Sequence, residues 1–584
     1  MLISLVLIPL LAAVAVSALG KKHSFLIGML GTLLPIIPMG VLAYQFDWTG
    51  GDQYQFARSW PWFPDLGLSF SIGTNAVGML LLMLSVLLGP ICIACSLTAV
   101  TRRVKTYYFW LLVLQSALCG VFMARDLILF YVFFEFTLVP MFVLISLYGS
   151  TNRKAAAIKF FLYTFTGSVI ALAGLVYVAW FNASTFGSTD VIRLWTFDIG
   201  ILQNAATQMP ASTQAWVFAA LMLGFSIKVP LFPLHTWLPL AHTEAPTAGS
   251  VILAGVLLKL GTFGILTFAI PFCPMAAVEY APFIATLAII GIIAAGLICW
   301  VQTDVKKLIA YSSVSHLGFC VLGLFALNAS GLQGAILYMI SHGLSTGALF
   351  LCIGMIYERY HTRNMKELGG LAAKMPVWAC FMVFFTMASV GLPGLNGFVS
   401  EFLCLFGAFQ AGDAWRGLAP KGTGWTPGEL GPTFAAVAAT GMVVSAIYLL
   451  YMLGKIVFGP LHEPHHHDAH GQDGDHEDAP KLPTDLGARE IGILLPLAAL
   501  CLATGMYPKP LLDALEKPVM ATVATVQQAR EKARMAEGVP PVALPTASAP
   551  TSATDSADHA AAAGAVPAQT NNPSNPSATK EGAH

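Results

Sequence analysis

The stretch that decides the fold reads Ser226-Ile-Lys-Val-Pro-Leu-Phe-Pro-Leu-His235, and it lies inside a long apolar run. Proline removes a backbone donor and clashes with the preceding helical turn, so a helix that contains Pro230 and Pro233 should open near its middle. A second stretch of the same kind, Gly391-Leu-Pro-Gly-Leu-Asn-Gly-Phe-Val-Ser-Glu401, interrupts another apolar run. Broken helices in corresponding positions of two halves are typical of transporters built from inverted repeats.

The composition predicts a membrane protein. Of the 584 residues, 56% are hydrophobic and only 10% are charged, and the mean hydropathy is +0.71. A soluble domain carries about 25% charged residues. Apolar runs of about 20 residues, enough for one helical crossing of a bilayer, recur about 14 times. The runs are continuously apolar instead of alternating, which favours helices over the strands of a barrel.

The predicted fold class is therefore all-α: a polytopic membrane protein of about 14 transmembrane helices with two inverted five-helix repeats, each containing a broken helix. The transmembrane domain covers 1–510, and the repeats cover roughly 106–270 and 282–458. The predicted spans are 2–19, 24–46, 74–98, 106–124, 127–148, 155–181, 213–241, 246–270, 282–301, 307–327, 332–357, 375–409, 432–458 and 490–508.

Two segments fall outside this pattern. Residues 462–485 form a His- and Asp-rich loop, expected to be cytoplasmic, which can bind zinc or nickel weakly but is more simply a solvated insertion. Residues 511–584 form a C-terminal tail. Its first part, 511–534, has the pattern of a short amphipathic surface helix, whereas 539–584 is rich in Ala, Pro, Ser and Thr and is expected to be disordered.

Lysine and arginine placement predicts the orientation, because basic residues accumulate in cytoplasmic loops. The loops on the opposite side hold only isolated basic residues, such as Arg58, Arg193 and Arg416. An even number of spans then puts both termini outside a bacterial inner membrane. The basic residues that fall in alternate loops on one side are Lys21, Lys22, Arg102, Arg103, Lys105, Arg153, Lys154, Lys306, Lys307, Arg359, Arg363, Lys366 and Lys374.

Charge and cysteine content exclude some classes of function. The formal net charge is zero, which gives no reason to expect nucleic acid as a partner. Cys92 and Cys95 form an isolated C-x-x-C pair inside a span, and we interpret them as core residues because no second pair completes a metal site. No Rossmann fingerprint, iron–sulfur spacing or haem motif is found in the sequence. The sequence thus predicts neither a cofactor nor a metal in this chain.

Five ionisable residues lie inside apolar runs, namely Glu135, Lys159, Lys228, Lys259 and Glu401. Each such placement costs of order 3 kcal/mol or more, so the default interpretation is a site that handles protons or ions. Lys159 is the weakest candidate, because it follows a basic loop closely and can extend towards the membrane surface.

The remaining four charged residues and three histidines predict a file of proton carriers along the membrane plane. Glu135 has no polar neighbour in its own turn, and Lys228, just before the first break, is its candidate partner. Lys259 lies near the middle of its span, and Glu401 repeats the arrangement in the second half. His235, His316 and His342 add groups that titrate near neutral pH. The hydroxyl groups that can hold water nearby are those of Ser312, Ser313, Ser315, Ser341, Ser345 and Thr346.

Structural alternatives remain open for these residues. A buried pair of opposite charges can serve only to fix helix packing. A neutral histidine bonded to a carbonyl would give the same pattern as a proton carrier. His235, His242 and Glu244 are either cytoplasmic uptake groups or helix caps, and Asp126 and Asp304 are caps or partners in charge pairs.

The run from Lys228 to Gly261, with Lys-Val-Pro-Leu-Phe-Pro-Leu-His, Ala-His-Thr-Glu-Ala-Pro and Val-Leu-Leu-Lys259-Leu-Gly, resembles the signature of the antiporter-like subunits of respiratory complex I. That superfamily also contains the large subunits of multi-subunit cation/proton antiporters and of membrane-bound hydrogenases. The resemblance extends over about 1–510. Glu401 discriminates within it, because sister chains usually place a lysine in the second broken helix.

The resemblance implies a role for each matching residue. Glu135 and Lys228 correspond to a modulating ion pair, Lys259 to the central proton-carrying lysine, and Glu401 to the terminal group that exchanges protons with the outside. His235, His316 and His342 correspond to members of the polar axis. Leu240 departs from the family, where an aspartate often follows Trp-Leu-Pro, so no carboxylate role is carried over at the cytoplasmic mouth.

The resemblance also implies an activity and partners. The expected function is outward proton translocation coupled to electron transfer in other subunits of an NADH:quinone oxidoreductase, with FMN and iron–sulfur clusters held by those subunits. The expected partners are the other membrane subunits, including antiporter-like L and N chains and small membrane subunits, together with the bilayer. Two alternatives are a subunit of a multi-subunit sodium/proton antiporter and a passive scaffold that joins neighbouring subunits.

Overall fold

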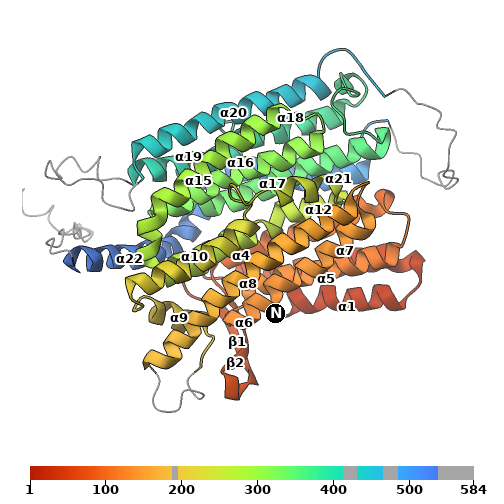
Figure 1. Ribbon diagram of the computed structural model, residues 1–584. Coiled ribbons are helices and arrows are strands. Elements are labelled where there is room, and N and C mark those ends of the chain that lie inside the picture. The colour runs from red at the N-terminus through yellow and green to blue at the C-terminus, as the bar shows by residue number, and fades with distance from the viewer. Residues whose placement is uncertain (187–194, 412–429, 465–483, 537–584) are drawn as a thin grey trace, which may run out of the picture. The chain divides into compact units, whose positions relative to one another are not determined.

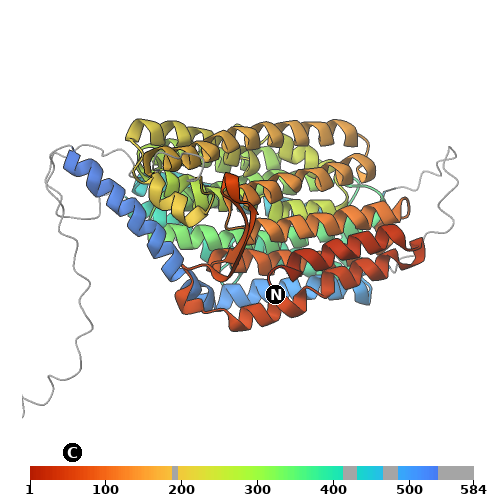
Figure 2. The same cartoon turned by 90° about the horizontal axis from the view of Figure 1, so that it is seen from below.

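The computed structural model describes residues 1–186, 195–411, 430–464 and 484–536. Most of the predicted 462–485 loop and all of 539–584 lie outside these residues. Long helices run side by side in Figure 1, and the same elements are seen from below in Figure 2. The helices up to the middle of the chain are α1 (Ser4–Ala18), α2 (Ser24–Leu33), α3 (Ile36–Gln45), α4 (Ala76–Ala99), α5 (Val104–Met123), α6 (Leu127–Phe136), α7 (Leu138–Tyr148), α8 (Arg153–Phe186), α9 (Ile199–Ala206), α10 (Ala211–Lys228) and α11 (Trp237–Glu244).

The second half continues in the same way. Its helices are α12 (Thr247–Ile252), α13 (Lys259–Gly264), α14 (Ile270–Phe272), α15 (Pro274–Trp300), α16 (Val305–Phe325), α17 (Ala329–Tyr360), α18 (Pro376–Val390), α19 (Asn396–Gln410), α20 (Pro432–Ile456), α21 (Ala488–Met506) and α22 (Lys509–Ala536). α22 covers the region predicted as an amphipathic helix and buries Leu515, Val519 and Val526 on one face.

Each predicted span coincides with one helix or with consecutive helices, which confirms the all-α polytopic class. Within the described residues, 11 helical segments are long and apolar enough to cross a membrane. Two shorter apolar helices, α1 and α18, accompany them. The total of 14 crossings and the two inverted repeats stay predictions.

Both predicted helix breaks are present. The first helix ends at Lys228 and resumes at Trp237, whose indole Nε1 donates to the carbonyl of Ile227 at 2.9 Å and so holds the two parts together. The second ends at Val390 and resumes at Asn396. Gly391 turns the chain there with φ +84°, a left-handed conformation that glycine adopts without a steric penalty.

Three features were not predicted. A two-stranded antiparallel hairpin, β1 (Gln55–Phe63) and β2 (Leu68–Thr74), interrupts the all-α pattern, and α9 is an additional short helix. Two spans are also divided, at Leu34–Pro35 and at Thr137. Pro35 directly precedes α3 and Pro140 lies in the first turn of α7. Proline is well tolerated at the start of a helix, because the amide it lacks would have no intrahelical partner there.

The hairpin is fixed to the helix that carries Glu135. Asp126 caps α6 by accepting from the amides of Ile128 and Leu129, at 2.9 and 3.0 Å. Its other oxygen accepts from the amide and hydroxyl of Ser69 on β2, at 3.1 and 3.3 Å. Burial raises the pKa of Asp126 above its usual range, while these hydrogen bonds act in the opposite direction. Asp126 is therefore a cap, one of the two interpretations left open by the sequence.

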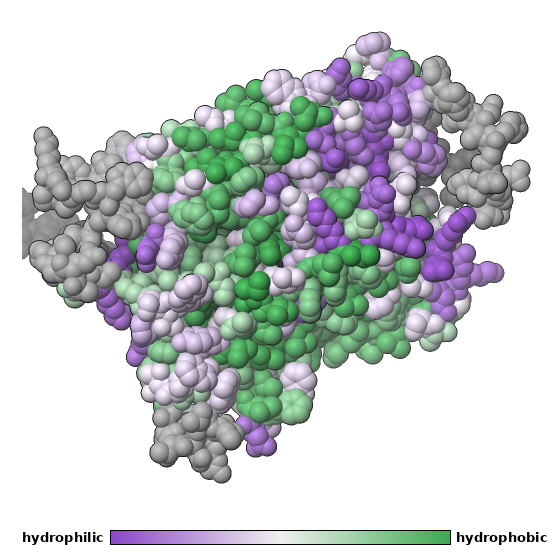
Figure 3. Space-filling view, in the orientation of Figure 1, coloured by the Kyte–Doolittle hydropathy of each residue, from purple (hydrophilic) through white to green (hydrophobic). Residues whose placement is uncertain are grey.

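The basic loops gather at one end of the helices, where α4 meets α5, α7 meets α8 and α15 meets α16; we call this the basic end. Hydrophilic residues concentrate there in Figure 3, and a hydrophobic belt covers the middle of the same face. Tyr148 donates to the carbonyl of Arg103 at 2.8 Å, and Arg363 pairs with Asp304 at 3.4 Å. The predicted grouping of the basic residues is therefore present, whereas the side that faces the cytoplasm stays a prediction.

A buried ion pair joins α17 to α21 near the basic end. Arg359 donates to both carboxylate oxygens of Glu490 at 2.8 Å, and the two side chains are only 6% and 4% exposed. Arg359 also donates to the carbonyl of Asp485 at 3.0 Å. A bidentate pair of this kind fixes the distance and the angle between the two helices.

Replacing Arg359 with methionine is expected to lower the free energy of unfolding by about 3 kcal/mol, because Glu490 is left buried and without its cation. Thermal unfolding in detergent measures the effect. The double variant Arg359→Met/Glu490→Gln is expected to be clearly more stable than Arg359→Met, since no uncompensated charge remains. Equal stability of the single and double variants would show that the pair does not hold the helices together.

Candidate functional site

Lys259 lies at the centre of the described bundle and is fully buried. Its helix changes from α to π geometry on both sides, over Leu253–Leu257 and Ile265–Ala269. Such π turns often mark functional sites in helices. The ammonium Nζ donates to the carbonyl of Ala254 and lies 2.7 Å from Nδ1 of His342 on α17. The lysine is therefore in direct hydrogen-bond contact with the next member of the predicted axis.

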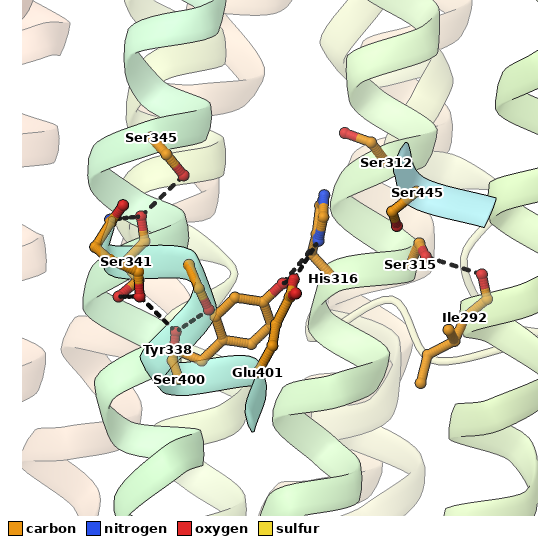
Figure 4. Close-up of polar contacts among 12 residues, drawn as sticks. Ile292, Ser312, Ser315, His316, Tyr338, Ser341, Ser345, Ser400, Glu401 and Ser445 are labelled. Carbon is orange, nitrogen blue, oxygen red and sulfur yellow. Dashed lines mark hydrogen bonds and ion pairs between the residues drawn. The ribbon is translucent and has the colours of Figure 1, made fainter. Parts of the chain in front are cut away.

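The axis continues from His342 to Glu401. The rings of His342 and His316 have centroids 6.1 Å apart. Nδ1 of His316 lies 2.7 Å from the hydroxyl of Tyr338 and 3.3 Å from Oε1 of Glu401, and Tyr338 donates to the same oxygen. Figure 4 shows Glu401, Tyr338 and His316 pointing towards one another from three helices. Four of the predicted residues thus form one file, Lys259, His342, His316 and Glu401.

Glu401 is held on its other side by the second helix break. A Cβ atom at Gly391 would lie 2.7 Å from Oε2 of Glu401, so a larger residue at this position would displace the carboxylate from its observed place. Asn396, at the start of α19, donates to the carbonyl of Ser341 at 3.1 Å, and Ser341 donates to the carbonyl of Asn396 at 3.2 Å. The opened helix therefore both supplies the carboxylate and connects it to α17.

The predicted pair of Glu135 and Lys228 is close but not in contact. Glu135 lies near enough to act electrostatically on Lys228, yet neither Oε2 of Glu135 nor Nζ of Lys228 has a hydrogen-bond partner. Lys228 is 3% exposed, and its ammonium lies over the ring of Phe134, 4.9 Å from the centroid. The structure therefore shows this pair in an open arrangement.

The end of α10 packs closely against the helix of Lys259. A Cβ atom at Gly261 would lie 2.9 Å from both the carbonyl of Phe225 and the amide of Val229. Glycine at this position lets the two backbones approach each other. Lys228 precedes Val229 and Lys259 lies two residues before Gly261. The two lysines are thus carried by adjoining segments.

Of the other predicted members, His235 lies in the first break and His242 on α11. His235 is 8% exposed, its Nδ1 has no hydrogen-bond partner, and its ring lies 6.4 Å from that of Tyr311. Lys159 donates to the carbonyl of Thr236 at 3.1 Å. It therefore contacts the first helix break, and its side chain does not extend only to the membrane surface. His235 is not brought into hydrogen-bond contact with Lys228 or Lys259.

A second group of residues leads from the basic end towards Lys259. A pocket of about 570 Å³ opens there and is lined in part by Lys306, Arg363 and Tyr107. Lys306 is 7% exposed and donates to the carbonyl of Ala245 at 2.5 Å. His242 is fully buried, and neither of its ring nitrogens has a hydrogen-bond partner. Its ring lies near enough to Lys306 and Lys259 to interact electrostatically with both ammonium groups.

Sequence reasoning missed Tyr338, Tyr448 and the role of Lys306. Tyr338 precedes His342 by four residues, so the helical period places both on one face, and this signal was available. Tyr448 on α20 lies 3.4 Å from Nε2 of His316 and gives no such signal, because its contact is made across helices. Lys306 was counted only as a loop residue that sets the orientation.

No cluster of three or more His, Cys, Asp or Glu side chains that could hold a metal ion occurs in the described parts of the chain. Cys92 and Cys95 are buried between α4 and its neighbours. The described side chains at the centre are instead a lysine, two histidines, a tyrosine and a glutamate, joined by hydrogen bonds except between the two histidine rings, whose centroids are 6.1 Å apart. The fold and the site together define a polytopic helical membrane protein with a buried row of titratable side chains.

Residues 124–422 match the family model described as NADH:quinone oxidoreductase/Mrp antiporter, TM. NADH-quinone oxidoreductase subunit M of Rhodobacter capsulatus is 41% identical over 462 residues, which cover 79% of this chain and 82% of the relative. NADH-ubiquinone oxidoreductase chain 4 of Chondrus crispus is 38% identical over 474 residues, covering 81% and 87%. The chain belongs to this family, with the antiporter-like M subunits of respiratory complex I.

Solved structures agree with this assignment. A chain of respiratory complex I from Thermus thermophilus with bound NADH superposes with a TM-score of 0.75 at 27% identity, over 90% of this chain and all of the other. A chain of the Mrp complex from Dietzia sp. DQ12-45-1b superposes with a TM-score of 0.73 at 22% identity, over 90% and 98%. The second likeness shows a shared fold alone.

Proposed function

We propose that this chain moves protons across the membrane as a subunit of NADH:quinone oxidoreductase, through the axis from Lys259 to Glu401. The observation that carries the proposal is the buried file of Lys259, His342, His316 and Glu401, in which Lys259 contacts His342, the two histidine rings lie 6.1 Å apart, and His316 contacts Glu401. All four residues are at most 2% exposed. A buried file of titratable groups of this kind is typical of proton relays.

The proton enters at the basic end and leaves beyond Glu401 in this proposal. The pocket brings water to Lys306, and His242 lies between the charges of Lys306 and Lys259. The basic end is then the cytoplasmic side, as the lysine and arginine distribution favours. The start of α1 and the end of α21 both lie away from the basic end, so both are outside in this orientation.

Lys228 controls the transfer. When Lys228 pairs with Glu135, its charge is balanced and Lys259 keeps a proton received from the cytoplasm. When the pair is open, as in this structure, Lys228 repels the proton on Lys259 and drives it through the histidines towards Glu401. Coulomb repulsion between two unit charges is strong at the low effective dielectric constant of a protein interior.

The energy comes from electron transfer in other subunits, to which FMN and iron–sulfur clusters belong. The partners are the other membrane subunits of the complex, with the antiporter-like L and N chains as neighbours, in a bacterial inner membrane. In this scheme His235 lies within the first helix break, and Lys159 stabilises the break by its hydrogen bond to Thr236. The likeness to the Mrp complex keeps one second candidate, a sodium/proton antiporter subunit, which predicts sodium-dependent exchange without NADH.

Replacing Glu135 with glutamine tests the proposal. Without the carboxylate, Lys228 stays in the open arrangement and Lys259 cannot hold its proton, so NADH-driven proton uptake into inside-out vesicles is expected to fall about tenfold, with slowed NADH oxidation. The complex must first be shown to assemble.

Unchanged proton uptake and unchanged NADH oxidation in Glu135→Gln would contradict the proposed function and favour the scaffold. Retained exchange that depends on sodium and needs no NADH would favour the antiporter. Thr164→Ala on the neighbouring α8 is a matched control, because its hydroxyl donates to the carbonyl of Phe160 at 2.7 Å and carries no charge.

A further inference from the structure

The ammonium of Lys228 contacts an aromatic ring and makes no hydrogen bond. Nζ lies 4.9 Å from the centroid of Phe134, within the range of a cation–π interaction. Nζ has no hydrogen-bond partner, and both residues are 3% exposed. A cation–π contact is strongest where water is excluded, as it is here.

The ring of Phe134 is held in place by two other rings. Phe130, one turn earlier on α6, stacks on it with centroids 5.6 Å apart. Phe225, one turn before Lys228 on α10, meets it edge to face at 6.1 Å. The ring is therefore fixed by packing, whereas the lysine side chain at the end of α10 carries the mobile charge.

Phe134 and Glu135 are consecutive residues of α6, so they leave the helix about 100° apart. One helical turn therefore presents two different partners for a cation, an aromatic face and a carboxylate. Oε2 of Glu135 has no hydrogen-bond partner while Nζ of Lys228 lies over the ring. The carboxylate and the ring are thus alternative partners of one ammonium.

We propose that Phe134 is a positioning residue for proton transfer: its ring holds Lys228 whenever the ion pair with Glu135 is open. This inference rests on the proposed function, because it assigns the open arrangement its own stabilising contact. Without the ring, the open ammonium would lie in an apolar core with no partner, and Lys228 would remain paired with Glu135. Lys259 would then keep its proton.

Ring fluorination tests the inference without changing the packing. Fluorine withdraws charge from the ring face while the shape stays nearly constant. Phe134 is replaced by mono-, di- and trifluorophenylalanine in the full complex, and NADH-driven proton uptake and NADH oxidation are measured in inside-out vesicles. Both rates are expected to fall stepwise with each fluorine, by about tenfold at three.

The same series at Phe122 is the matched control. Phe122 on α5 is also buried and meets Phe263 edge to face, but within the described residues its ring has no cation–π contact. Its series is expected to leave both rates unchanged. A second pair of variants adds a rescue: Phe134→Leu is expected to lose uptake, and Phe134→Tyr, which keeps an aromatic face, to retain it.

Rates that do not follow fluorine number at Phe134, or that fall equally at Phe122, would overturn the inference. The same holds if Phe134→Leu and Phe134→Tyr behave alike. The proposed function is tested separately by Glu135→Gln. If Glu135→Gln strongly lowers proton uptake while the fluorinated variants of Phe134 pump normally, only the role of Phe134 is rejected. If neither change affects proton uptake, the control of Lys259 by Glu135 and Lys228 is rejected.

Discussion

Replacing Lys259 with methionine is expected to reduce NADH-driven proton uptake into inside-out vesicles by about 100-fold, the loss typical of removing a positioned proton-transfer group. Methionine fills nearly the same space but carries no proton. His342 then loses the donor that lies 2.7 Å from its Nδ1. The file is interrupted at its first member, and coupled NADH oxidation slows with it.

The same variant is expected to leave stability unchanged or slightly higher. An ammonium that is buried without a counter-ion in contact lowers the stability of the fold by its desolvation free energy, and an apolar group of similar volume has no such penalty. Thermal unfolding in detergent checks this. Leu257→Met, two residues away and equally buried, is the matched control and should keep full proton uptake. A Lys259→Met protein that unfolds early, or one that pumps normally, would contradict the assignment.

Replacing Glu401 with glutamine should have an effect of similar size, about 100-fold on proton uptake. The amide oxygen can still accept from Tyr338, so the packing of α19 against α17 is retained. The amide cannot take up or release a proton, so transfer stops at His316. The measurement is again NADH-driven uptake in vesicles of confirmed assembly.

Glu401→Asp separates chemistry from geometry at this position. Aspartate restores a titratable carboxyl but is one methylene shorter, so its contacts with Tyr338 and His316 lengthen and partial uptake is expected. Equal uptake in Glu401→Gln and the unaltered protein would place the end of the path elsewhere. Tyr448, which lies 3.4 Å from His316 Nε2, would then be the next residue to change.

Most of the fold could be predicted from the sequence because a bilayer leaves few choices. Helical runs and proline breaks follow from hydrogen-bond requirements in hydrocarbon, and both breaks were found where Pro230 and Pro393 place them. The hairpin of 55–74 could not be predicted in the same way. Its stability depends on Asp126 and Ser69, which are 57 residues apart. Such non-local contacts have no periodic signal.

The buried charged residues could be predicted from the sequence as well, because Lys259 and Glu401 are charged residues within apolar runs. Their contacts were not. The sequence suggested a direct pair of Glu135 and Lys228, and the structure places the ammonium over Phe134. This role of Phe134 could not be predicted from the sequence, because a phenylalanine within an apolar run looks like any other core residue. His242 and Lys306 likewise acquire their connection only when α11 and α16 pack together.

The four central ionisable residues comprise two acids and two bases, Glu135, Glu401, Lys228 and Lys259. When both carboxyls are ionised and both amines protonated, their charges sum to zero. The transmembrane voltage, which acts with about 2.3 kcal/mol per elementary charge per 100 mV, then exerts no net force on the set as a whole. It acts only on the one proton in transit. With a glutamate instead of a lysine at 401, these four residues carry no net charge when all are ionised, so the voltage does net work on the set only through the proton that is transported.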